Sequence, residues 1–206
     1  MMESSEAATQ EAPTERGRKR REQIVDAAMG LFDDRGFHAT SIDEIGAASG
    51  ITGPGLYRHF AGKDDILLAV FDRIWELLRG AIERLEGLEP EDALDVLIET
   101  HMTLALEQGE ALMLLVRELR HVPDYYQRAA ERNDARYTDT WAEVIIKLHP
   151  KLTLDEARAA AHAVMGLIGS AARDNVVYSI ANPRHRMILH DMARKSLEAF
   201  QVESGG

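Results

Sequence analysis

The sequence predicts an all-α fold with about nine helices. Apolar residues recur at three- and four-residue spacing through most of the chain, which is the period of an amphipathic helix. Glycines, prolines and Ser/Thr–Glu pairs punctuate the chain at helix-length intervals, as helix ends require. No stretch keeps the two-residue alternation of a half-buried strand. These observations predict helices and no sheet.

The N-terminal part of the chain predicts a tail followed by one helix. Residues 1–15 are polar, contain Pro13 and show no period, so we expect a disordered tail. The first helix should start near Gly17 or Arg18. It presents Ile24, Ala28, Leu31 and Phe32 on one face and ends at Gly36.

Residues 40–63 predict two short helices joined by a tight turn. Ser41 and Glu44 form a capping box for the first of them, and Gly50 ends it. Thr52 is expected to cap the second helix, residues 53–60, whose first turn tolerates Pro54. Helix, glycine turn and short helix is the arrangement of a DNA-reading helix-turn-helix. We therefore expect a helix-turn-helix domain over residues 16–62.

The remainder, residues 63–206, predicts a second domain made of helices. Its connecting helix, residues 63–86, is apolar on more than one face and should pack on both sides. Further helices are expected over 91–108, 111–121, 125–149 and 153–180, and a last one ends near residue 200. The 153–180 helix opens with a Thr153–Glu156 capping box.

Composition narrows the class of protein. The chain has 206 residues and no cysteine, which excludes disulfides and thiolate chemistry, and no apolar run reaches bilayer length. A bacterial cytoplasmic protein is expected. The net charge is −11, yet basic residues cluster just before the helix-turn-helix, and a local basic face is what attracts phosphate. That cluster comprises Arg16, Arg18, Lys19, Arg20 and Arg21.

Two segments identify a family resemblance: LFDDRGFHATSIDEIGAASGI and LYRHFAGKDDIL. Over residues 18–68 the chain resembles the N-terminal domain of the TetR family of transcriptional repressors. The resemblance implies a homodimer whose last two helices form the interface. It also implies a ligand-responsive regulator, with a repressor that a small effector releases from a pseudopalindromic operator as the first expectation. Whether the protein represses or activates stays open.

The resemblance implies specific DNA contacts. The expected DNA-binding residues are Arg18, Lys19, Arg20, Ser41, Thr52, Gly53, Leu56, Tyr57, His59 and Lys63. Leu56 would touch a thymine methyl group or belong to the core. The Gly53-Pro54-Gly55 tip departs from the family pattern, and it leaves few side chains for direct readout.

The second domain is expected to hold an effector pocket between helices. Its candidate walls are Trp75, Leu78, Met102, Leu106, Met113, Arg117, Tyr126, Trp141, Ile145 and Met165. Arg117 and Arg120 should pair with Glu118, Glu107, Glu110 or an anionic ligand. The stretch VRELRHVP is similar to that of acyl-CoA-responsive regulators, so an acyl-CoA or fatty acid is one hypothesis and an uncharged hydrophobic compound the other.

Other classes of protein stay open. The sequence has no zinc-protease spacing, phosphate-binding loop or nucleophile elbow, so we expect no metal, cofactor or catalytic site. A helical ligand carrier would leave the aromatic and basic tip at residues 57–63 unexplained. An architectural DNA-binding protein would lack operator specificity and would need no pocket.

Overall fold

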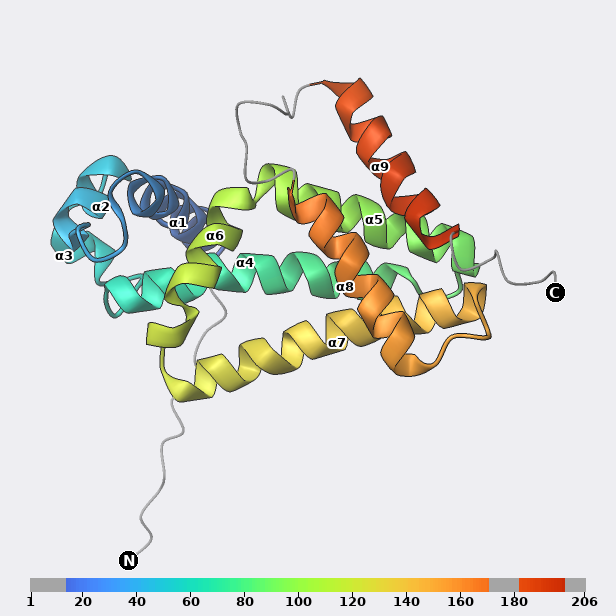
Figure 1. Cartoon of the computed structure of the whole chain (residues 1–206). Helices are drawn as coiled ribbons and strands as arrows, with labels where there is room; N and C mark the ends of the chain where they lie inside the picture. The colour runs from blue at the N-terminus through green and yellow to red at the C-terminus, as the bar shows by residue number, and fades with distance from the viewer. Residues whose placement is uncertain (1–13, 171–181, 199–206) are drawn as a thin grey trace, which may run out of the picture. The chain divides into compact units, whose positions relative to one another are not determined.

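A computed structural model describes residues 14–170 and 182–198, and all its regular elements are helical, as the sequence predicts. The chain divides into two compact units, residues 1–67 and 68–206, with the division inside α4. Figure 1 shows the helices in chain order. Their bounds are α1 Glu15–Arg35, α2 Ile42–Ala48, α3 Gly53–Leu56, α4 Lys63–Arg84, α5 Pro90–Glu107, α6 Gly109–Glu118, the 3₁₀ helix η1 Leu119–His121, α7 Asp124–Leu148, α8 Leu154–Ser170 and α9 Pro183–Glu198.

Helix α1 begins earlier than the sequence suggested. Thr14 Oγ1 accepts a hydrogen bond from the Gly17 amide at 3.2 Å, so Thr14 is the N-cap and Glu15 the first helical residue. A threonine oxygen in this position satisfies an amide that has no intrahelical partner. Thr14 and Glu15 therefore belong to the helix, while residues 1–13 of the expected tail lie outside the described residues.

The second helix of the helix-turn-helix is shorter than predicted. We expected residues 53–60, but α3 ends at Leu56 and continues as a turn in which the His59 amide donates to the Leu56 carbonyl at 2.8 Å. Two glycines and a proline within four residues explain the early end of α3, because glycine and proline have the lowest helix propensities. Thr52 also makes no side-chain capping bond.

The core of the second unit lies among α5, α7 and α8. Helix α7 packs against both α5 and α8, and α8 also packs against α9 (Figure 1). Phe71 of α4 meets the Tyr126 ring of α7 at 6.2 Å between centroids. Trp141, Leu97 and Ile98 are fully buried there. The expected 153–180 helix is described as far as Ser170, and its last part lies outside the described residues.

Ion pairs fasten α9 to α5. Arg186 reaches Glu99 at 3.1 Å and Glu107 at 2.9 Å, and Arg194 bonds to Asp95. These contacts join residues that are about ninety positions apart in the chain, and they place the last described helix on the fifth. Within the described residues, no helix is both long and apolar enough to span a membrane.

Candidate nucleic-acid interface and effector cavity

The start of α2 carries the capping box that the sequence predicts. The Glu44 amide donates to Ser41 Oγ at 3.3 Å, while the Ser41 amide donates to Glu44 Oε2 at 2.8 Å. The Ser41 hydroxyl also donates to Glu44 Oε2 at 2.8 Å. The backbone bond from Ser41, followed by its side-chain bond and the charge of Arg35, lowers the pKa of Glu44. A phosphate bound by the Ser41 hydroxyl would therefore have to replace Glu44 as its acceptor.

The turn between α2 and α3 needs glycine at two positions. Gly50 has φ 67°, a left-handed conformation that other residues rarely adopt. The Ile51 amide donates to the Gly46 carbonyl at 2.8 Å. A Cβ on Gly46 would lie 2.9 Å from the Ile51 carbonyl oxygen. Close packing of the turn thus requires glycine at position 46, although glycine weakens a helix interior.

The tip of α3 presents few side chains to solvent. Thr52 and Tyr57 are exposed, Tyr57 by 59%, whereas Leu56 is fully buried. Of the two roles that the sequence left open for Leu56, the structure gives it the one in the core. A Cβ on Gly55 would meet Ile51 Cγ2 at 2.8 Å, so the glycine-rich tip lets α3 approach the turn closely. Gly53 itself is half-buried.

Arg21 braces the segment that follows α3. Its Nη1 donates to the His59 carbonyl at 2.5 Å, and its guanidinium carbon lies 3.9 Å from the centre of the Phe60 ring. The cation–π contact and the charged hydrogen bond act on neighbouring residues. Arg21 therefore positions His59 from α1, although sequence reasoning counted it only as part of a basic cluster.

A basic groove of about 690 Å³ lies on the first unit, where the start of α1 meets the end of the helix-turn-helix. Lys19 and Arg20 line it, as does His59, all three of which were predicted to bind DNA. Arg18 is exposed near by in α1 but does not line the groove. Sequence reasoning missed Arg58 as a site residue, although it stands between two predicted ones. The full lining is Thr14, Glu15, Arg16, Gly17, Lys19, Arg20, Gln23, Arg58 and His59.

The remaining predicted DNA contact, Lys63, is turned toward its own backbone. Its ammonium donates to the carbonyls of Phe37 and Thr40, each at 2.8 Å, and more weakly to that of His38 at 3.4 Å. An ammonium has three donors, and all three are used here. A phosphate would have to displace one of these carbonyls, so its role in phosphate binding stays a prediction.

The second unit contains an apolar cavity of about 290 Å³. Three of its walls, Trp75, Leu78 and Met165, were predicted from the sequence. His101 of α5 and Tyr137 of α7 were missed, although Tyr137 stands one helical turn before Trp141 on the same helix. The His101 and Tyr137 rings are stacked with centroids 6.1 Å apart, and Trp141 meets both rings edge-on.

Other predicted walls of the pocket lie outside this cavity. Met102, Leu106, Trp141 and Ile145 are buried in the core, and Met113 is exposed. Tyr126 donates its hydroxyl proton to Asp72 Oδ1 at 2.8 Å and so serves the contact between α4 and α7. Burial, followed by the bond to Asp72, raises the pKa of Tyr126. The role of these predicted wall residues in ligand binding stays a prediction, because none of them lines the cavity.

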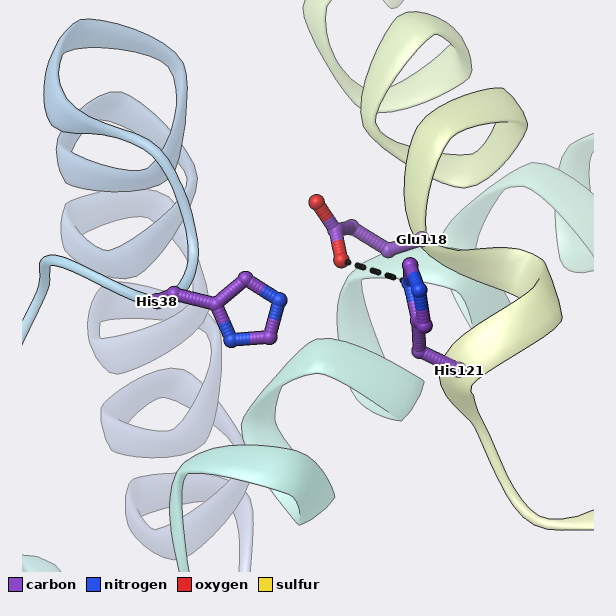
Figure 2. Close-up of side chains that lie close together, drawn as sticks. All are labelled: His38, Glu118 and His121. Carbon is purple, nitrogen blue, oxygen red and sulfur yellow. Dashed lines mark ion pairs between the residues drawn. The ribbon is translucent and has the colours of Figure 1, made fainter.

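Arg117 and Arg120 were expected to need a partner, but both side chains are exposed, so burial does not impose that need. Two of the proposed partners are engaged elsewhere. Glu118 Oε2 lies 3.4 Å from His121 Nδ1, as the dashed line in Figure 2 shows, and Glu107 pairs with Arg186. The solvated guanidinium groups carry no desolvation cost that a counter-ion must offset.

Comparison with known proteins gives matches concentrated in the N-terminal part. Residues 24–70 match the family described as "Bacterial regulatory proteins, tetR family". The chain is 46% identical over 55 residues to the transcriptional activator FasR of Mycolicibacterium smegmatis, an alignment that covers 27% of this chain and 25% of FasR. It is 39% identical over 108 residues to the regulator AcrR of Shigella flexneri, covering 49% of this chain and 48% of AcrR. The chain thus spans half or less of these relatives' lengths.

The similarity in fold covers more of the chain than the similarity in sequence does. The crystal structure of AibR, solved with isovaleryl coenzyme A and operator DNA, superposes with a TM-score of 0.68 at 18% identity and covers 85% of this chain and 97% of that one. A capped helix-turn-helix followed by a helical unit is the arrangement of helix-turn-helix proteins. Within that class, residues 24–70 are similar to the TetR family of bacterial regulatory proteins.

Proposed function

We propose that this protein is a sequence-specific DNA-binding transcriptional regulator that acts as a homodimer and responds to a small molecule. The observation that carries the proposal is the basic groove beside the helix-turn-helix on an otherwise acidic chain. Clustered Arg and Lys attract phosphate locally, whatever the net charge. Exposed Thr52 and Tyr57 at the tip of α3 would contact the duplex. We expect repression, because the N-terminal domain resembles that of a family of repressors. FasR, an activator, shows that the opposite sign of regulation also occurs among the relatives.

The few exposed side chains at the α3 tip suggest how the sequence would be read. Gly53 and Gly55 have no side chains, so backbone groups rather than side chains would approach the DNA at these positions. Contacts to phosphates position a protein, whereas sequence-dependent shape discriminates between sites. We propose that DNA shape contributes much of the operator specificity.

Dimerisation is proposed through α8 and α9 with a second copy of the chain. One face of α8 is both exposed and made of small residues: Ala159, Ala163, Gly166 and Ser170. Helix α9 exposes Met187, Ile188 and Met192, each by about half. Small residues allow two helices to approach closely, and exposed apolar side chains favour burial by a partner. Two recognition helices about 34 Å apart would then meet successive major grooves of a pseudopalindrome.

The effector would occupy the cavity of the second unit. A ligand shifts the equilibrium between two states only if it binds them unequally. Helix α4 begins in the first unit and continues along the cavity with Trp75 and Leu78. A ligand that moves these side chains would act on the helix that joins the two units. An acyl-CoA, such as the one in the AibR crystal, and an uncharged hydrophobic compound are both candidates.

The test is fluorescence anisotropy of the full chain with labelled DNA from upstream of its own gene, beside a scrambled duplex at the same fixed salt. Specific regulators bind their sites about 10³-fold or more tightly than other DNA. We expect selective binding, and release on addition of effector. Equal binding to both duplexes would favour an architectural protein. Failure of a folded dimer to bind either duplex would leave a ligand carrier as the better description.

A further inference from the structure

The cavity of the second unit combines apolar walls with a small aromatic cluster. Leu104, Leu112 and Leu115 contribute aliphatic surface, and Trp75 and Tyr137 contribute aromatic surface. Its volume of about 290 Å³ is at the lower end for small-molecule sites. The lining comes from α4, α5, α6, η1, α7 and α8, all from residues beyond 67, so it belongs to one unit of the structure.

Three polar groups in this lining are buried without a hydrogen-bond partner: Trp75 Nε1, His101 Nδ1 and the hydroxyl of Tyr137. The last two belong to rings that stack on each other. The Tyr137 residue is only 3% exposed. Trp141 Nε1 lies next to the Tyr137 hydroxyl without reaching hydrogen-bonding geometry, and the backbone of Met165 approaches His101 without serving Nδ1. A buried polar atom of this kind costs free energy until it finds a partner.

The charge of the lining excludes one class of ligand. The charged side chains among its described residues are Glu131 and Asp134, and Lys and Arg are absent from that set. Burial lowers the pKa of His101 to about 4, so its imidazole is neutral near pH 7. A carboxylate in this cavity would meet two like charges and no cation, which disfavours it.

We propose that this cavity binds the uncharged, oxygen-bearing end of an apolar molecule, with Tyr137 and His101 as its hydrogen-bond partners, and that it discriminates against free carboxylic acids. The inference rests on the proposed function of the second unit as an effector domain. A hydroxyl or carbonyl oxygen accepts from the Tyr137 hydroxyl, and a ligand hydroxyl donates to His101 Nδ1. A free alcohol, a ketone and an acyl thioester each offer an uncharged oxygen that accepts from Tyr137, and the alcohol can also donate to His101. The carboxylate of an ionised fatty acid accepts as well, but it brings a negative charge into a lining that already carries Glu131 and Asp134.

Isothermal titration of the full chain with 1-octanol, 2-octanone and octanoate at pH 7.5 tests the proposal, because the three probes share an apolar body. We expect the two neutral probes to bind at least about tenfold more tightly than octanoate. Tyr137→Phe should weaken 1-octanol binding by about five- to tenfold. This variant removes an unpaired buried hydroxyl and so should fold at least as well as the parent. The matched control is Tyr125→Phe, a residue of the same helix that is 62% exposed and does not line the cavity.

Three results would overturn the proposal: octanoate binding as tightly as 1-octanol, unchanged octanol affinity in Tyr137→Phe, or no binding of either neutral probe up to its solubility. Octanoyl-CoA beside free CoA then distinguishes the source of the neutral oxygen. Displacement of 1-octanol by octanoyl-CoA indicates a thioester, and failure to displace it indicates a free alcohol or ketone. The same preparation in the DNA assay separates the two proposals, since selective DNA binding without probe binding removes only the cavity assignment.

Discussion

The ammonium of Lys63 lies 2.8 Å from the carbonyl oxygen of Phe37 and 4.5 Å from the centre of the Phe37 ring. The same group donates to the Thr40 carbonyl. One side chain at the start of α4 therefore holds the loop between α1 and α2, directly before the capping box of the helix-turn-helix.

Lys63→Met should destabilise the protein by about 1–3 kcal/mol, because three backbone carbonyls lose a charged donor. Lys19→Met is the control, since among the described residues Lys19 forms an exposed ion pair with Glu15 at 3.1 Å and no other ion pair. An exposed pair of this kind contributes little, so the control should change the free energy of unfolding by about 0.5 kcal/mol or less. Urea denaturation followed by far-ultraviolet circular dichroism measures both. Equal effects would mean that the three hydrogen bonds add nothing to stability.

Gly46→Ala and Gly80→Ala should have opposite effects on stability. A Cβ at Gly46 meets a backbone oxygen at 2.9 Å, whereas nothing lies within 4 Å of the corresponding position at Gly80. Alanine in an unhindered helix interior gains about 0.5–1 kcal/mol over glycine. We therefore expect a higher melting temperature for Gly80→Ala and a lower one for Gly46→Ala in the same thermal scan. A stabilised Gly46→Ala protein would show that the turn has room to relax.

Stability should fall in acid through His101. Burial lowers its pKa from 6.5 to about 4, opposed in part by the Met165 backbone, so between these values the unfolded chain binds the proton and the native protein does not. The free energy of unfolding therefore has its full value above pH 6.5. It falls by on the order of 3 kcal/mol as the pH drops toward 4.

His101→Phe should remove most of that decline in urea denaturation at pH 7 and pH 4.5. The control is His162→Phe, an exposed residue of α8, which should keep it. Glu131 and Asp134 line the same cavity and are present in both variants. The assignment fails if the His101 variant loses stability as steeply as the parent.

Gly166→Leu should raise the dimer dissociation constant by at least about tenfold, since a large side chain would separate two α8 helices that approach closely. Within the described part of the protomer nothing lies within 4 Å of a Cβ at Gly166, so the fold itself tolerates the change. Gly30→Leu, at an equally open position of α1, should leave association unchanged. Sedimentation equilibrium measures both. A Gly166→Leu protein that dimerises normally would place the interface elsewhere.

Arg58→Gln should reduce the salt dependence of DNA binding by about one counterion, because Arg58 lines the basic groove. Affinity should drop on cognate and scrambled DNA alike, as expected of a phosphate contact. Arg132 is an exposed arginine of α7 in the second unit, and Arg132→Gln should leave the slope unchanged. The slopes come from anisotropy titrations at several salt concentrations. An unaltered slope in Arg58→Gln would remove the groove from the interface.

Local signals made the helix-turn-helix predictable. The Ser41–Glu44 capping box and the glycine stop at Gly50 depend on residues within a few positions of one another, and both appear in the structure as expected. The end of α3 was misjudged because the aromatic pattern through Phe60 outweighed the poor helix propensity of Gly53-Pro54-Gly55. A turn of the chain buries Phe60 as well as a helix would.

The cavity was much less predictable, because helical spacing identifies an apolar face without showing which part of it meets a void. Met102 and Met165 are both methionines at helical spacing, yet Met102 is fully buried in the core and Met165 lines the cavity. His101 is the neighbour of Met102 in sequence and was not among the predicted wall residues. Its importance depends on stacking against Tyr137, which is a tertiary contact.

The two tryptophans of the chain, Trp75 and Trp141, both belong to the second unit, and the first unit has none. Tryptophan fluorescence therefore reports on the second unit only. Indole emission will report on the surroundings of Trp75 at the cavity and of Trp141 against His101 and Tyr137. Unfolding of the first unit alone would escape detection by tryptophan absorption or emission, because that unit has no tryptophan. A chain whose first unit has lost its structure would thus look native by its tryptophan fluorescence.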